Sequence, residues 1–198
     1  MYSIVLASQS PRRKQLLEWA EVPFQIVSQF TDESFPPDMP VEEVPIHVAR
    51  QKAIVTKEHL QNAYHGRHAN EPVLAADTIV VLDNEVINKP CDLEEAVLML
   101  KKLSGKTHRV ITGVVILFGE QEISFADITE VEFHPLTEEQ VRFYVEKYKP
   151  LDKAGAYAIQ EWIGVIGIKS IKGDFYNVMG LPISRVLIEL KKIGLTIT

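Results

Sequence analysis

Cysteine is nearly absent from this 198-residue chain, which carries only Cys91. A single cysteine excludes an internal disulfide framework and a zinc site built from a cysteine cluster, and it indicates a reducing compartment. Long apolar runs are also missing, because the longest, Val110–Gly119, falls short of the ~18–20 residues that a membrane helix needs. The beginning of the chain lacks the basic, apolar and small-residue pattern of a secretory signal. We therefore expect a cytoplasmic protein without a membrane partner.

An excess of positive charge is absent as well. Lys and Arg total 21 against 27 Asp and Glu, a formal net charge of −6. This balance argues against a broad basic face, so we expect no stable complex with nucleic acid. A small anionic ligand stays compatible with it, because a few converging cations reverse the potential locally. With 46% apolar residues the chain can bury a sizeable core, and its length predicts one domain over residues 1–198, built as one compact unit or two lobes.

Several common motifs of nucleotide and hydrolytic enzymes are missing. Gly105-Lys106-Thr107 resembles the end of a P-loop, but Leu100 stands where the first glycine is required. No G-x-G-x-x-G follows a predicted strand, and neither H-E-x-x-H nor G-x-S-x-G occurs. Residues 62–71 hold His65 and His68 in a polar connector, which favours a solvated loop over a metal site. Dinucleotide binding, zinc protease and serine hydrolase chemistry are unsupported.

Strand-like and helix-like segments alternate early in the chain, and a longer meander occupies its middle. This order predicts an α/β fold with a mixed twisted sheet flanked by helices. Capping patterns mark helix starts at Ser10-Pro11, at Asp92 with Glu95, and at Thr137 with Gln140. The expected strands are 2–7, 24–28, 73–82, 85–87, 109–118, 122–133 and 165–171, and the expected helices are 10–19, 45–60, 92–103, 137–148 and 182–193.

The segment Ser8-Gln9-Ser10-Pro11-Arg12-Arg13 lies where a strand ends and a helix begins. Backbone amides at a helix start favour an anion, and two arginines add fork-shaped phosphate donors. A positive pair in the first turn opposes the helix dipole, which favours acids there. A capped helix with exposed arginines is the alternative, but this local conflict favours an anion-binding site.

Asp77 stands inside an apolar strand, where a carboxylate is costly unless it is paired, hydrogen-bonded or bound to metal. Taken singly, Asp77 could cap a strand end, Glu33 could be an ordinary acid in a loop, and Lys52 and Lys89 could be surface lysines. Taken together, these residues supply the carboxylates and cations that phosphoryl transfer requires. Carboxylates hold a divalent cation, and lysines and arginines neutralise phosphate oxygens in the transition state.

At this point the chain resembles the Maf family of nucleoside triphosphate pyrophosphatases. The resemblance runs in family order from Leu6 to Pro182, so it covers nearly the whole chain. The matching segments are Leu6–Arg13, Asp32-Glu33-Ser34, Ala49–Ala53, Ala76-Asp77-Thr78, Lys89-Pro90, Gly105–Gly113, Gly155–Gln160 and Asn177–Pro182.

The resemblance implies hydrolysis of a nucleoside triphosphate between its α- and β-phosphates, with a divalent metal cofactor, Mg²⁺ or Mn²⁺. It implies an inosine-triphosphatase-like fold with two lobes around a cleft, and a homodimer. Asp77 would be the proton acceptor and would hold the metal with Glu33. The implied phosphate contacts are Ser8, Arg12, Arg13, Lys52 and Lys89.

The branch of the family that acts on dTTP and UTP is similar at Arg13, Thr78 and Gln160, which stand at its specificity positions. A glutamine amide presents both a donor and an acceptor to a pyrimidine edge. Two departures touch this region: Asn88 and Glu161 stand where the family usually has glycine. Two alternative functions stay open. One is the same reaction on modified nucleotides such as 7-methyl-GTP, and the other is a non-catalytic, nucleotide-binding role in the regulation of cell division.

Overall fold

A computed structural model describes residues 3–63 and 71–195. Of the connector predicted at 62–71, residues 64–70 lie outside the described residues, and residues 62–63 belong to a helix. The chain divides into two compact units. The first comprises residues 1–77, 112–127 and 180–198, and the second comprises residues 78–111 and 128–179. Several long strands contribute residues to both units, so each unit is built from segments far apart in the sequence.

The strands form one mixed sheet in the order β2-β1-β3-β5-β6-β7, with β4 paired to β3. Strand β1 is parallel to both β2 and β3, whereas β4 is antiparallel to β3 and β7 is antiparallel to β6. This arrangement confirms the predicted α/β fold with a mixed sheet flanked by helices. The strands are β1 (Ile4–Leu6), β2 (Phe24–Ile26), β3 (Val73–Leu82), β4 (Glu85–Ile87), β5 (Thr107–Phe118), β6 (Gln121–Phe133) and β7 (Ile168–Lys172).

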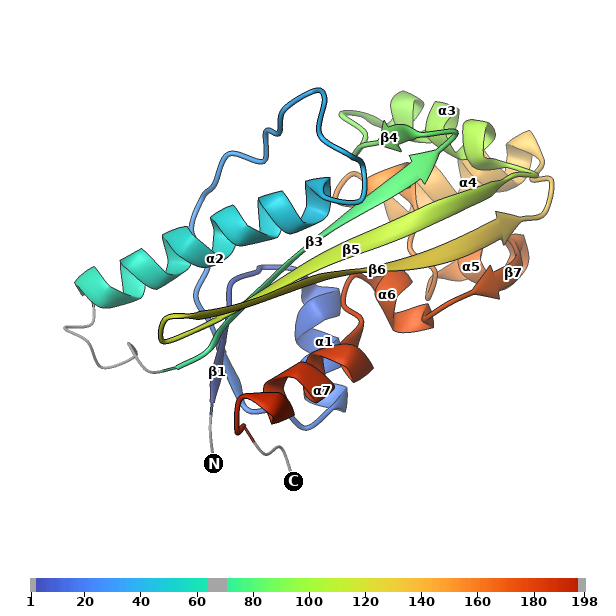
Figure 1. Ribbon diagram of the computed structural model, residues 1–198. Coiled ribbons are helices and arrows are strands. Elements are labelled where there is room, and N and C mark those ends of the chain that lie inside the picture. Colours follow the sequence, from blue (N-terminus) through green and yellow to red (C-terminus); the bar gives the residue numbers. More distant parts are fainter. Residues whose placement is uncertain (1–2, 64–70, 196–198) are drawn as a thin grey trace. The chain divides into compact units, whose positions relative to one another are not determined.

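Helix α2 (Val44–Ala63) covers one face of the strands of the first unit (Figure 1). Its buried Ala49, Ala53 and Leu60 pack in one cluster with strand residues that include Val5 and Val73. The small side chains let the helix approach the sheet closely, and burial of this apolar area stabilises the contact.

Gly113 of β5 sets the position at which α2 begins. A Cβ atom at this glycine would collide with the backbone of Pro45 and Ile46 in the first turn of the helix. Only glycine permits so close an approach of two backbones. The register of α2 on the sheet is therefore tied to this position.

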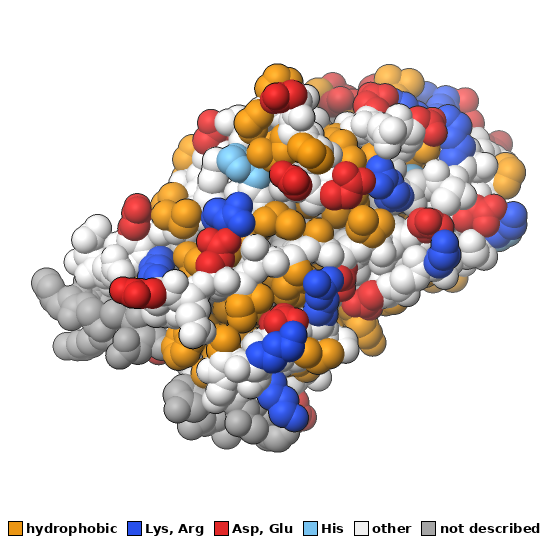
Figure 2. Space-filling model, viewed as in Figure 1, with side chains coloured by type: hydrophobic (Ala, Val, Ile, Leu, Met, Phe, Trp, Pro, Cys, Tyr) orange, Lys and Arg blue, Asp and Glu red, His pale blue; other side chains and the backbone are white. Residues whose placement is uncertain are grey.

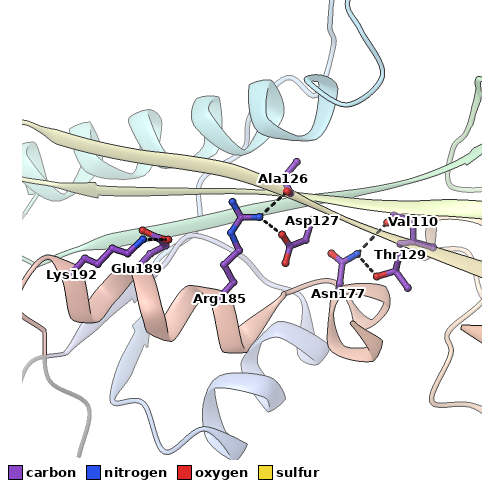
Figure 3. A network of polar contacts seen from close by, with 8 residues as sticks. All are labelled: Val110, Ala126, Asp127, Thr129, Asn177, Arg185, Glu189 and Lys192. Carbon is purple, nitrogen blue, oxygen red and sulfur yellow. Dashed lines mark hydrogen bonds and ion pairs between the residues drawn. The ribbon is translucent and has the colours of Figure 1, made fainter. Parts of the chain in front are cut away.

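Helices α1 (Pro11–Trp19) and α7 (Ile183–Lys192) lie on the other face of the same unit (Figure 1). Arg185 holds α7 to β6: its Nη1 donates to the carbonyl of Ala126 at 3.1 Å and to the Asp127 carboxylate (Figure 3). Its guanidinium also lies over the Phe125 ring, 4.2 Å from the centroid. Gly194, with φ of 83°, follows the C-cap residue of α7 in the left-handed conformation that often ends a helix.

The second unit contains α3 (Leu93–Leu103), α4 (Glu138–Tyr148), a short 3₁₀ turn η1 (Ala154–Ala156), α5 (Trp162–Gly167) and α6 (Phe175–Met179). Both predicted caps are present. The Asp92 side chain accepts from the Glu95 amide, and Thr137 and Gln140 form a reciprocal capping box. Asn177 fixes α6, because its buried Nδ2 donates to the Val110 carbonyl at 3.1 Å and to Thr129 Oγ1 at 3.0 Å (Figure 3).

The predicted strand at 165–171 is wrong over its first three residues. The sequence pattern places a strand over 165–171, but Val165 belongs to helix α5 and the strand begins at Ile168. The amides of Gly164 and Val165 both donate to the carbonyl of Glu161, which starts a helical turn that apolar composition alone does not signal. A short apolar run of this kind is compatible with both a strand and a helix, and these hydrogen bonds make residues 162–167 helical.

Acidic and basic side chains are interspersed over the face shown in Figure 2. This distribution agrees with the balanced composition of the chain. Among the described residues, no helix is both long and apolar enough to span a membrane.

Candidate active site

The strand-to-helix turn after β1 is organised by the Ser8 hydroxyl. Arg13 Nη1 donates to Ser8 Oγ at 3.1 Å, and the backbone amide of Ser10 donates to the same oxygen at 3.2 Å. Arg13 Nε donates to the carbonyl of Gly180 at 2.7 Å, which links α1 to the segment just before α7. These contacts fix the chain at the point where the helix amides become available to an anion.

Ser10 precedes the helix as expected, but its side chain makes no capping hydrogen bond. The sequence predicted that the Ser10 hydroxyl would accept an amide of the first turn, and this detail is wrong. The Ser10 backbone amide instead pairs with Ser8, so the hydroxyl that organises this turn comes from the residue two positions earlier. Pro11 at the first helical position is confirmed.

Lys52, Glu33 and Asp77 meet at one point of the first unit. Lys52 Nζ lies 2.7 Å from Glu33 Oε1 and 2.8 Å from Asp77 Oδ1. The side chains of Lys52 and Asp77 are only 15% and 13% exposed, whereas that of Glu33 is 47% exposed. A carboxylate this far from solvent needs a partner, and Lys52 is one.

Each of these three groups is placed by a different element. Lys52 projects from α2, which starts against Gly113, and Asp77 lies within β3. Glu33 sits in a loop shaped by Asp32, whose carboxylate accepts from the Ser34 amide at 3.0 Å and from its hydroxyl at 2.8 Å. Those two hydrogen bonds lower the pKa of Asp32. The loop is therefore held in an Asx-type turn that presents Glu33 to Lys52.

Arg13 belongs electrostatically to the same cluster. Burial lowers the pKa of its guanidinium, while the negative charges of Asp77 and Glu33 raise it. Because a guanidinium stays protonated in proteins, Arg13 contributes a permanent positive charge. The first unit thus brings together Ser8, Arg13, Glu33, Lys52 and Asp77, and Arg12 lies beside them in the first turn of α1.

The other predicted site residues belong to the second unit. Thr78 directly follows Asp77 in β3 and is partly buried, while Lys89 and Gln160 are exposed. The two departures from the family pattern also have definite places. Asn88 contributes its backbone carbonyl, which accepts from the Gly155 amide at 3.1 Å, and Glu161 precedes α5.

The carboxylate pair fits a divalent cation of the magnesium type. Mg²⁺ is usually held by one or two carboxylates together with substrate phosphates and water, rather than by a full protein cage. Two acids converging on a single positive charge supply that donor set, and among the described residues no larger group of His, Cys, Asp or Glu side chains could hold a metal. Glu33 and Asp77 are therefore compatible with such an ion in the presence of a phosphate ligand.

Some contributors to the site escaped sequence reasoning. The Gly180 carbonyl anchors Arg13 from 167 positions away, a contact that no local pattern signals. In the second unit Lys153 is buried, although a lysine beside an aspartate is typical of an exposed surface.

A mixed α/β protein with an anion-favouring helix start beside a lysine-bridged carboxylate pair belongs to the class that binds phosphorylated ligands. Residues 3–193 match the family model described as Maf-like protein. The chain therefore belongs to the Maf family.

Curated relatives cover almost all of the chain. It is 51% identical over 189 residues to a protein of Cytophaga hutchinsonii named dTTP/UTP pyrophosphatase, an alignment covering 96% of this chain and 83% of that protein. It is 48% identical over 193 residues to the protein of the same name from Bacteroides thetaiotaomicron, with 97% and 96% covered.

Proposed function

We propose that this protein hydrolyses nucleoside triphosphates, dTTP and UTP in particular, to the monophosphate and pyrophosphate. The observation that carries the proposal is the convergence of Glu33 and Asp77 on Lys52 beside the buried Arg13. The name shared by relatives that match 96–97% of the chain supports the same reaction and the same pair of substrates.

Asp77 is the proposed general base. Its carboxylate lies mostly out of solvent and is held by Lys52, so it is oriented before substrate arrives. Water would attack at the α–β anhydride, a phosphorus–oxygen bond would form as the anhydride bond breaks, and the water proton would pass to an Asp77 oxygen. Pyrophosphate is the leaving group, so no covalent enzyme intermediate is needed.

Cations of the chain would bind the triphosphate. Arg12 and the amides at the start of α1 would face the anion, and the ammonium groups of Lys52 and Lys89 would add positive charge. Arg13 is 9% exposed and already donates to Ser8 and Gly180, so we assign it to holding Ser8 and to supplying charge. The growing negative charge of the transition state is what these groups stabilise.

Glu33 and Asp77 would hold a divalent metal ion, Mg²⁺ or Mn²⁺. When bound, such an ion neutralises phosphate oxygens and orients the anhydride. In that state Lys52 would no longer be needed between the carboxylates, and its ammonium could reach a phosphate oxygen instead. The lysine thus balances the carboxylate pair while substrate is absent.

Gln160, Thr78 and Arg13 stand at the specificity positions of the dTTP/UTP branch. Of these, Gln160 and Thr78 are proposed to contact the base, since Arg13 is buried and holds Ser8. Gln160 is exposed and its amide can both donate to and accept from a pyrimidine edge. We further propose that the protein acts in the cytoplasm as a single Maf-like domain that forms a homodimer. Size-exclusion chromatography with light scattering tests the dimer, and a mass of one chain would refute it.

A panel of triphosphates tests the function. Purified protein is incubated with dTTP, UTP, CTP, GTP, ATP and 7-methyl-GTP, with and without Mg²⁺ or Mn²⁺, and pyrophosphate release is followed. We expect metal-dependent release that is fastest with dTTP and UTP. Preference for 7-methyl-GTP would retain the chemistry and overturn the pyrimidine assignment, while binding without release from any triphosphate would favour a regulator.

A further inference from the structure

Gln160 is an exposed side chain at the end of a buried segment. Residues 155–159 are buried, whereas Gln160 itself is exposed. The backbone that carries the proposed base-reading amide is therefore fixed by the protein interior. The residues that surround this segment therefore set the position of the Gln160 side-chain amide.

A single hydroxyl holds both sides of Gln160. The backbone amide of Ala158 donates to Tyr144 Oη at 3.2 Å, and the Tyr144 hydroxyl donates to the Glu161 carboxylate. Tyr144 is 0% exposed and lies in α4, so this anchor belongs to a rigid part of the second unit. The backbone amide of Glu161 closes the turn by donating to the Ala158 carbonyl at 3.1 Å.

Lys153 reinforces this anchor from the start of the segment. Its Nζ lies 3.6 Å from Glu161 Oε1 and 2.8 Å from Asp152 Oδ1, and the residue is only 7% exposed. Burying a lysine is expensive unless its charge is matched, so the acidic partners are required for it to stay there. Glu161, one of the residues that departs from the family pattern, supplies one of the matching charges.

The same segment is tied to the backbone beside Lys89. The amide of Gly155 donates to the carbonyl of Asn88, the residue before Lys89. Because a backbone carbonyl accepts this bond, asparagine in place of glycine leaves it unchanged. The segment therefore connects the two exposed residues that the proposed function assigns to substrate in this unit.

We infer that Tyr144, Glu161 and Lys153 are positioning residues for Gln160, and that they set the preference for a uracil or thymine base. The inference rests on the proposed function, in which Gln160 contacts the base. These three side chains hold the backbone on both sides of Gln160, so its amide meets the pyrimidine edge without first being ordered. A loosened segment binds the base less tightly and distinguishes bases less well.

The Tyr144→Phe variant tests the inference, because it removes both hydrogen bonds and leaves the ring and every charge in place. Tyr148→Phe is the matched control, since it removes a hydroxyl from the neighbouring ring of the same helix, stacked on Tyr144 at 4.9 Å. Glu161→Gln is a second variant that removes the ion pair with Lys153 and keeps an acceptor for the Tyr144 hydroxyl. Thermal unfolding of each variant establishes that it is folded.

Two measurements are made on each variant. Hydrogen–deuterium exchange of the peptide over residues 157–161 reads the order of the segment without substrate. Steady-state kinetics with UTP and CTP give KM, kcat and the ratio of the two specificity constants. For Tyr144→Phe we expect faster exchange, a KM for UTP raised about tenfold with kcat within about twofold, and a reduced UTP preference.

The outcomes separate the two proposals. Unchanged exchange in both Tyr144→Phe and Glu161→Gln overturns the positioning role, whatever the activity. Faster exchange with an unchanged UTP preference overturns the link to base choice. Wild-type protein that releases pyrophosphate from no triphosphate overturns the proposed function, while exchange still reports whether the network orders the segment.

Discussion

Lys52 Nζ lies 2.8 Å from Asp77 Oδ1, so the carboxylate proposed as the general base is already paired with a cation before any ligand is bound. The same nitrogen lies 2.7 Å from Glu33 Oε1. A lysine with two acids is held by more than a surface ion pair would supply, because Lys52 and Asp77 are both mostly buried. This lysine is the structural link between the anion-binding and acid–base parts of the site.

Replacing Lys52 by methionine should leave two facing carboxylates without this shared positive charge. We expect tighter binding of Mn²⁺ to the substrate-free protein, because the ion no longer competes with an ammonium group, and at least a 100-fold loss in kcat/KM for UTP. Titration followed by the electron paramagnetic resonance of free Mn²⁺ measures the first effect. Lys57→Met, on the same helix, is the control, and equal Mn²⁺ affinity in both variants would contradict the account.

Replacing Arg13 by lysine should cost both stability and activity. An ammonium group cannot reproduce the fork that donates to Gly180 and Ser8 together. We expect about 2 kcal/mol of lost unfolding free energy from two buried hydrogen bonds, measured by urea denaturation. Lys14→Met serves as the control, because Lys14 forms an exposed pair with Glu18, which contributes little to stability. If the two variants unfold at the same urea concentration, Arg13 is not an anchor.

Gly113 should not tolerate a side chain. A Cβ there collides with the backbone of Pro45 and Ile46, so α2 must move, and with it Lys52. Gly113→Ala should lose about 2–3 kcal/mol of stability and most of its activity. Gly119→Ala, in open space at φ of 58°, should lose about 1 kcal/mol and keep its activity. Equal activities for the two variants would show that the position of α2 does not affect the site.

His108 should make stability depend on pH. Burial lowers its pKa to about 4, and its Nε2 pairs with the Tyr157 hydroxyl at 2.7 Å between edge-packed aromatic rings. In the unfolded chain a histidine titrates near 6.5, so as pH falls from about 6.5 to 4 the unfolded state binds the proton first. The free energy of unfolding therefore falls, by up to about 3 kcal/mol from this residue.

Urea denaturation across that pH range, on wild type and on His108→Gln, isolates the effect. Glutamine keeps a polar group for Tyr157 but does not titrate, so the difference between the two stability curves belongs to His108. We expect the curves to converge as pH falls toward 4. Curves that stay parallel from pH 6.5 to 4 would show that His108 has an ordinary pKa.

Local signals predicted much of the fold because they arise from neighbouring residues. The Asp92 and Thr137 caps and the apolar strand 73–82 each depend on a few adjacent side chains, and all three were confirmed. The Ser10 cap and the start of β7 were wrong although the contacts that decide them are also local. The Ser8 hydroxyl takes the amide of Ser10, and the Glu161 carbonyl accepts from Gly164 and Val165, and residue type alone does not distinguish these hydrogen bonds from the predicted ones.

For the site, the sequence predicted which residues take part but not how they contact one another. Residue type and family resemblance indicated Glu33, Lys52 and Asp77, but only the fold shows that Lys52 bridges the two acids. The roles of Gly180 and Lys153 depend on packing between segments distant in sequence. No spacing of residues in the sequence predicts these contacts.

Asp77 is the proposed base in hydrolysis of the α–β anhydride of UTP or dTTP. The most direct test measures pyrophosphate release from UTP with Mg²⁺ by wild type and by Asp77→Asn, an isosteric change that removes the proton acceptor. Thermal unfolding checks that the variant is folded, and binding of UTP is measured separately. We predict a folded variant that still binds UTP and releases pyrophosphate at least 1,000-fold more slowly, a loss on the order of that for removing a general base. Pyrophosphate release at the wild-type rate by the folded Asp77→Asn protein would contradict the account.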